Sequence, residues 1–62
     1  MKLEVLLNML NTIIAKATYY KDETSIKKLC QLRHNVYYER EFDYEESLNS
    51  IKKFDIQLKK YE

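Results

Sequence analysis

The stretch that decides the fold is VYYEREFDYEE, residues 36–46. Apolar residues on both sides of it follow helical spacing, and at about 100° of rotation per residue their two stripes have nearly the same phase. Periodicity alone therefore permits one long helix over residues 24–61. Tyr38 and Phe42 argue against it, because both fall well off the stripe and a continuous helix would leave two large aromatic side chains in water. We predict a break here, with Phe42 folding back.

Residues beside each break are suited to start a new helix. Asp43 and Glu46 form an acidic variant of the capping box, in which a side-chain oxygen accepts a hydrogen bond from a free N–H of the first turn. In KDETS, residues 21–25, either Asp22 or Thr24 could cap in the same way. The sequence therefore predicts three helices, at about residues 2–20, 24–39 and 43–61.

The expected core consists of one apolar stripe from each helix. The stripes are Leu3, Leu6, Leu7, Leu10, Ile13, Ile14, Ala17 and Tyr20 in the first helix, Ile26, Leu29, Cys30, Val36 and Tyr37 in the second, and Tyr44, Leu48, Ile51, Phe54, Leu58 and Tyr61 in the third. Tyr20 and Tyr37, each the inner member of a tyrosine pair, are expected to close the ends of the core. The chain has no Gly and no Pro, which disfavours tight hairpins and strands.

The chain is short for an independent fold. With 62 residues, a single core rarely supplies more than about 3–5 kcal/mol of net stability. One cysteine excludes an internal disulfide and suits a reducing compartment. We therefore expect one all-α domain over residues 1–62, a small three-helix bundle or helical hairpin without strands, completed by homodimerisation.

Net charge and hydropathy indicate which partners and which cellular compartment to expect for the protein. The formal net charge is +1, which gives no overall field for an acidic partner. The N-terminal segment is apolar, but Glu4, Asn8 and Asn11 interrupt it well short of the ~20 apolar residues that span a bilayer. We expect a cytoplasmic protein that does not bind a membrane. The amino-acid composition, rich in Lys, Ile, Tyr and Asn, is typical of proteins encoded by AT-rich bacterial, phage or viral genomes.

Candidate catalytic and metal-binding patterns are weak. The chain has no Gly-rich phosphate loop and no nucleophile elbow. Cys30 and His34 have i, i+4 spacing, but zinc prefers four ligands and the chain has no other Cys or His. The acidic run through residues 39–46 lacks the spacing and turn glycine of a calcium loop. We predict no enzyme activity, no cofactor and no metal site.

The leading hypothesis is a non-catalytic protein–protein interaction module: a regulator, adaptor or inhibitor that docks a helical face on an unidentified partner protein. Arginine and aromatic residues are enriched among binding hot spots. The expected contacts are the off-stripe aromatics and the two arginines of the second helix, Tyr19, Tyr38, Phe42, Arg33 and Arg40. For the two arginines taken by themselves, structural pairing with a carboxylate, within the chain or across a dimer, is favoured over an interface role; the expected pairs are Arg33 with Asp55 and Arg40 with Glu4.

Two other functions stay open. A nucleic-acid-binding regulator could use the lysine-rich helix faces for phosphate contacts; its residues would be Lys27, Lys28, Lys52, Lys53, Lys59 and Lys60. Against it, the acidic run between the two lysine groups cancels much of their potential. The chain could also serve as a structural subunit of a larger assembly.

Overall fold

The computed structural model describes residues 2–40 and 42–62, and Glu41, within the predicted break, lies outside the described residues. It contains three α-helices, α1 (Lys2–Tyr19), α2 (Glu23–His34) and α3 (Tyr44–Leu58). A π-helical turn, Asn35–Glu39, continues α2, and a 3-10 turn, Lys59–Tyr61, continues α3. The described residues contain no strand, so the expectation of three helices in an all-α fold is confirmed.

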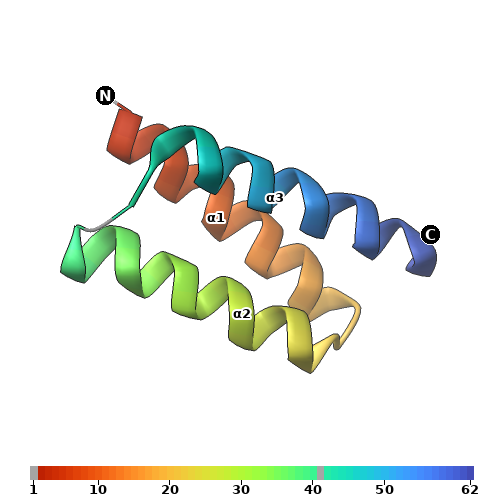
Figure 1. The fold of residues 1–62 in the computed structure, drawn as a ribbon. Helices are drawn as coiled ribbons and strands as arrows, with labels where there is room; N and C mark the ends of the chain where they lie inside the picture. The colour runs from red at the N-terminus through yellow and green to blue at the C-terminus, as the bar shows by residue number, and fades with distance from the viewer. Residues whose placement is uncertain (1, 41) are drawn as a thin grey trace.

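The helices form a compact bundle with α1 packed against both of the others. Figure 1 shows α1 and α3 running in the same direction, with α2 antiparallel to both. The α1–α2 turn and the C-terminus therefore lie at one end, and the N-terminus and the α2–α3 connection at the other. None of the helices among these residues is long and apolar enough to cross a membrane.

Most residues of the predicted stripes form the core or pack against it. The buried apolar residues are Leu6, Leu10, Ile13 and Ala17 of α1, Leu29 of α2, Val36 of the π turn, and Ile51 and Leu58 of α3. The expected burial of Tyr61 is wrong, because it lies in the 3-10 turn and is 41% exposed. Tyr20 packs against this core as expected. The same expectation for Tyr37 is wrong, because its side chain is 50% exposed. It belongs to the π turn, whose winding departs from the α-helical period on which the prediction was based.

The α1–α2 turn is a Schellman motif built without glycine. Lys21 has a left-handed backbone, with φ of 58°. Its N–H donates to the Thr18 carbonyl at 3.0 Å, and the Asp22 N–H donates to the Ala17 carbonyl at 3.1 Å. These are the two reversed hydrogen bonds of the motif, and they satisfy carbonyls that the helix end leaves free. Asp22 then caps α2, its Oδ1 accepting from the Ser25 N–H at 3.2 Å.

Replacing Lys21 with glycine should stabilise the protein by about 1 kcal/mol, since a β-carbon in the left-handed region costs roughly 1–2 kcal/mol and glycine adopts it freely. The measurement is urea unfolding followed by circular dichroism. Lys21→Ala is the matched control, because it removes the same side chain but keeps the β-carbon. Equal stability of the Gly and Ala variants would contradict the prediction.

The α2–α3 break is made in a similar way. Arg40 ends the π turn with φ of 56°, again in the left-handed region. Asp43 caps α3 as predicted, its Oδ1 accepting from the Glu46 N–H at 2.9 Å. Phe42, just before the cap, is half-buried and packs against the core. The aromatic ring therefore folds back, as its position off the apolar stripe suggested.

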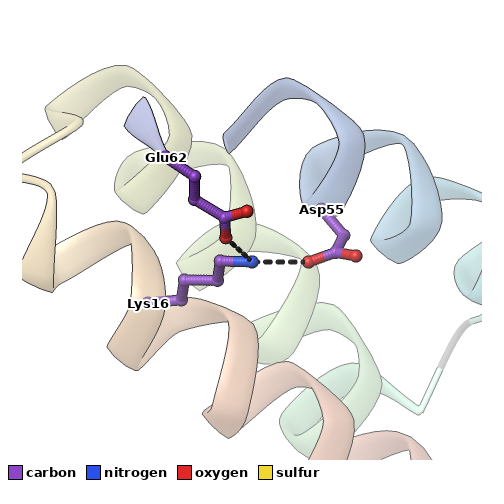
Figure 2. A network of polar contacts seen from close by, with 3 residues as sticks. All are labelled: Lys16, Asp55 and Glu62. Atoms are coloured by element: carbon purple, nitrogen blue, oxygen red, sulfur yellow. Dashed lines mark hydrogen bonds and ion pairs between the residues drawn. The ribbon is translucent and has the colours of Figure 1, made fainter. Parts of the chain in front are cut away.

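The C-terminal turn is tied to the end of α1 and to the start of α2. Lys16 Nζ lies 3.1 Å from Asp55 Oδ1 and 2.9 Å from Glu62 Oε1, an arrangement drawn in Figure 2. Hydrogen bonds to Glu62 and then to Asp55 raise the pKa of the Lys16 ammonium. The Tyr61 ring stacks on Tyr20 at a centroid distance of 5.0 Å.

The hydroxyl of Tyr61 links the C-terminal turn to the start of α2 by donating a hydrogen bond to Asp22 Oδ2 at 3.0 Å. The pKa of the Asp22 carboxyl is lowered, first by the hydrogen bond from the Ser25 backbone N–H and then by the Tyr61 hydroxyl. One carboxylate therefore caps α2 and holds the C-terminal turn.

Candidate functional site

A groove between α1 and α2 is lined by amide, thiol, guanidinium, imidazole and phenol side chains. Its volume is about 400 Å³. The residues that line it are Leu7 and Asn11 of α1, Cys30, Arg33 and His34 of α2, and Tyr37 and Tyr38 of the π turn. We call it the α1–α2 groove. None of these lining residues is acidic, and Arg33 is the only one that carries a permanent charge.

Both tyrosines that line this groove belong to the π turn. Hydrogen bonding from residue i to i+5 puts more residues in each turn, so successive side chains rotate less around the axis than in an α-helix. Tyr37 and Tyr38 lie edge to face, with ring centroids 4.8 Å apart and planes at 89°. They do not form one flat stacking platform, but they share one wall, where Tyr38 is 70% exposed.

Arg33 is held in the groove by an uncharged partner. Its Nη1 donates to Asn11 Oδ1 at 2.9 Å, across the α1–α2 interface. The predicted Arg33–Asp55 pair is wrong, because Asp55 pairs with Lys16 instead. Arg33 as a whole is half-buried, whereas this hydrogen bond is exposed. The aliphatic stem is therefore covered while the guanidinium faces outward.

His34 borders the groove beside Tyr38. The two rings lie 4.9 Å apart at a tilt of 35°. His34 Nε2 lies 3.6 Å from Glu39 Oε1. This carboxylate therefore lies beside the imidazole, and it is not within ion-pair distance of Arg33.

The other predicted contact residues lie elsewhere. Tyr19 is 80% exposed at the end of α1, the opposite end of the bundle from the π turn. Arg40 is exposed at the end of the π turn and does not line the groove. The predicted Arg40–Glu4 pair is wrong, because within residues 2–40 and 42–62 neither side chain forms an ion pair. Phe42 lines a different depression, between α2 and the start of α3. The structure thus brings together only Arg33 and Tyr38 of the predicted set.

Five lining residues were not predicted as contacts: Leu7, Asn11, Cys30, His34 and Tyr37. Part of the signal was present in the sequence, because Cys30, Arg33, His34 and Tyr37 have i, i+3, i+4 and i+7 spacing on one flank of α2. Asn11 gave no such signal, since its role depends on how α1 packs beside α2.

The lysines of the nucleic-acid hypothesis are all exposed. Lys27 and Lys28 lie on α2, Lys52 and Lys53 on α3, and Lys59 and Lys60 on the 3-10 turn. Lys60 Nζ lies 5.1 Å from the Tyr61 ring centroid and contributes to the lowered pKa of Asp22. The Lys60 ammonium therefore already interacts with the Tyr61 ring and the Asp22 carboxylate of the same chain.

In the part of the chain that the structure describes, no group of three or more His, Cys, Asp and Glu side chains could hold a metal ion. Cys30 and His34 both line the groove, as their spacing implies.

No family model, no curated protein and no solved structure matches this chain.

Proposed function

We propose that this protein is a non-catalytic protein–protein interaction module, a small regulator, adaptor or inhibitor that docks on a partner protein through the α1–α2 groove. The observation that carries the proposal is Tyr38, 70% exposed in a groove that also contains Arg33. A large aromatic side chain beside an arginine, on a rigid helical support, is the composition typical of a binding hot spot. Tyr37, 50% exposed on the same wall, enlarges this surface.

The binding surface continues along the π turn toward Arg40. π turns inside helices occur frequently at functional sites. Here the turn carries two exposed tyrosines and ends in an arginine with a left-handed backbone. Non-glycine residues with a left-handed backbone cluster at functional positions.

A double variant, Tyr38→Ser with Arg40→Gly, should lose partner binding and keep its helicity. Glycine at position 40 removes the guanidinium and suits the left-handed backbone there, so the fold is expected to tolerate it. The measurement is affinity capture from the native host, with circular dichroism as the folding check. We expect the principal captured protein to be depleted at least tenfold.

Tyr19→Ser is the matched control, since it removes another highly exposed tyrosine from the other end of the bundle. Loss of the partner with Tyr19→Ser, but not with the double variant, would place the site elsewhere. Unfolding of the double variant would show that these residues are structural.

A nucleic-acid-binding function remains the alternative, supported by the exposure of the six lysines on α2, α3 and the 3-10 turn. Phosphate contacts make affinity fall steeply with ionic strength. Binding of a duplex or a single strand that weakens steeply with salt would favour this function. A complete lack of binding at low salt would remove it.

We also propose that the protein self-associates. A second groove, about 480 Å³ in volume, lies between α1 and α3, and its apolar residues are Met9, Ile13 and Ile51. Covering it with a second copy would add apolar burial to a core of modest size. Val5, 46% exposed one turn before Met9, extends the apolar surface along α1.

Sedimentation equilibrium at high micromolar concentration should give the mass of a dimer. Thr12 is exposed and lines the α1–α3 groove, so Thr12→Arg should give a folded monomer. Asn49→Arg, at an exposed position of α3 outside the groove lining, should remain dimeric. A strictly monomeric wild-type protein would contradict the proposal.

A further inference from the structure

The α1–α2 groove contains an arginine whose guanidinium is positioned but not neutralised. Arg33 donates one hydrogen bond, to the neutral amide oxygen of Asn11. Within residues 2–40 and 42–62, no carboxylate lies within ion-pair distance of Arg33. A guanidinium has five N–H donors, so several remain available for an incoming group.

We propose that the partner segment that binds this groove is acidic, with an Asp or Glu carboxylate on Arg33 and a neighbouring apolar side chain against Tyr37, Tyr38 and Leu7. The inference rests on the proposed docking function and names the chemistry of the partner. Arginine binds carboxylates with two parallel hydrogen bonds, which gives both strength and orientation. Because Asn11 already fixes one edge of the guanidinium, less side-chain entropy is lost when a carboxylate binds.

The lining explains why the ligand is acidic and partly apolar. Among the lining residues that the structure describes, one has a permanent positive charge, none is acidic, and two have exposed aromatic rings. Glu39, the carboxylate beside the groove, contacts His34 and leaves Arg33 free to bind. A basic segment would place its charge near Arg33 without a compensating carboxylate in the lining.

The size and charge of the groove favour a short protein segment over a nucleic acid. About 400 Å³ is near the lower end of ligand-binding pockets, room for a few side chains. Nucleic-acid binding relies on many phosphate contacts along a basic surface. A single arginine in the same groove as two tyrosines matches one carboxylate beside one apolar side chain.

The experiment is selection from a random twelve-residue peptide library on wild-type protein and on Arg33→Gln. We expect peptides selected on wild-type protein to be enriched in Asp or Glu next to an aromatic or aliphatic residue. The same enrichment should be absent on Arg33→Gln, which keeps a hydrogen-bonding side chain without the charge. For a selected peptide, replacing the acidic residue with its amide should weaken binding at least tenfold.

Cys30 reports where the peptide binds. It is the only cysteine of the chain, it lines the groove and it is partly exposed. A peptide in the groove should slow alkylation of Cys30 by iodoacetamide, measured by intact mass. Sodium acetate is the small-carboxylate control, and inorganic phosphate tests for a general anion site.

The outcomes separate this inference from the proposed function. Peptides that protect Cys30 but show no acidic preference would overturn the inference and leave the docking function standing. Equal protection by acetate or phosphate at the peptide's working concentration would also overturn it. If no peptide binds wild-type protein better than Arg33→Gln and Tyr38→Ser, both the inference and the proposed use of this groove fail.

Discussion

Leu10→Ala should abolish the cooperative fold. Leu10 lies in the middle of α1 with 0% exposure, and α1 is the helix that packs against both of the others. Removing a buried leucine side chain costs about 2–5 kcal/mol. A core of this size supplies about 3–5 kcal/mol in total, so the substitution removes most or all of it. The expected result is a weak helical signal in circular dichroism and no cooperative thermal transition.

Val5→Ala is the matched control for Leu10→Ala. It shortens another aliphatic residue of the same helix, but Val5 is 46% exposed. Substitutions at such positions usually change stability by less than about 0.5 kcal/mol. If the Leu10→Ala protein melts like Val5→Ala, the central role of α1 in the bundle is contradicted. Dimerisation would make the melting temperature depend on protein concentration, so all variants are compared at one concentration.

Ala17→Leu has the second largest expected effect. Ala17 has 0% exposure at the end of α1, beside the turn to α2. A small buried residue there leaves no space for three additional carbon atoms, and overpacking a core usually costs about 1–3 kcal/mol. The expected result is a lower urea midpoint with helicity retained at zero denaturant.

Ala15→Leu separates overpacking from helix propensity. Ala15 is exposed on the same helix, and the exchange of Ala for Leu has nearly the same propensity cost at both positions. Ala15→Leu should therefore unfold at nearly the wild-type urea concentration. Equal destabilisation by the two variants would show that Ala17 is not confined by its neighbours.

The break between α2 and α3 was predictable from the sequence, although the backbone geometry that makes it was not. Tyr38 and Phe42, off the common stripe, predicted it, and Asp43 predicted the cap. These signals are local: a cap acts within three residues, and a stripe repeats every three or four. The means of breaking the helix was not predicted, because a chain without glycine gives no sign of which residue adopts a left-handed backbone. Here it is Lys21 in one turn and Arg40 in the other.

The candidate site was predicted less completely than the fold. Sequence reasoning selected Arg33 and Tyr38, which share the α1–α2 groove, but also Tyr19 and Phe42, which lie at other places. Exposure alone could not distinguish them. The distinction came from tertiary packing, which places Tyr37 and Tyr38 in the same groove as Arg33 and places Asn11 within hydrogen-bond distance of Arg33.

The sequence by itself determined that the chain is helical, where its helices are capped and which faces are buried. Those properties follow from hydrogen bonds and periodicities that span a few neighbouring residues. Only the tertiary structure decided which side chains of different helices come into contact. The Arg33–Asn11 hydrogen bond joins residues 22 positions apart, and the Lys16–Asp55 pair joins residues 39 positions apart. Such contacts depend on the direction and rotation of each packed helix, which no local pattern specifies.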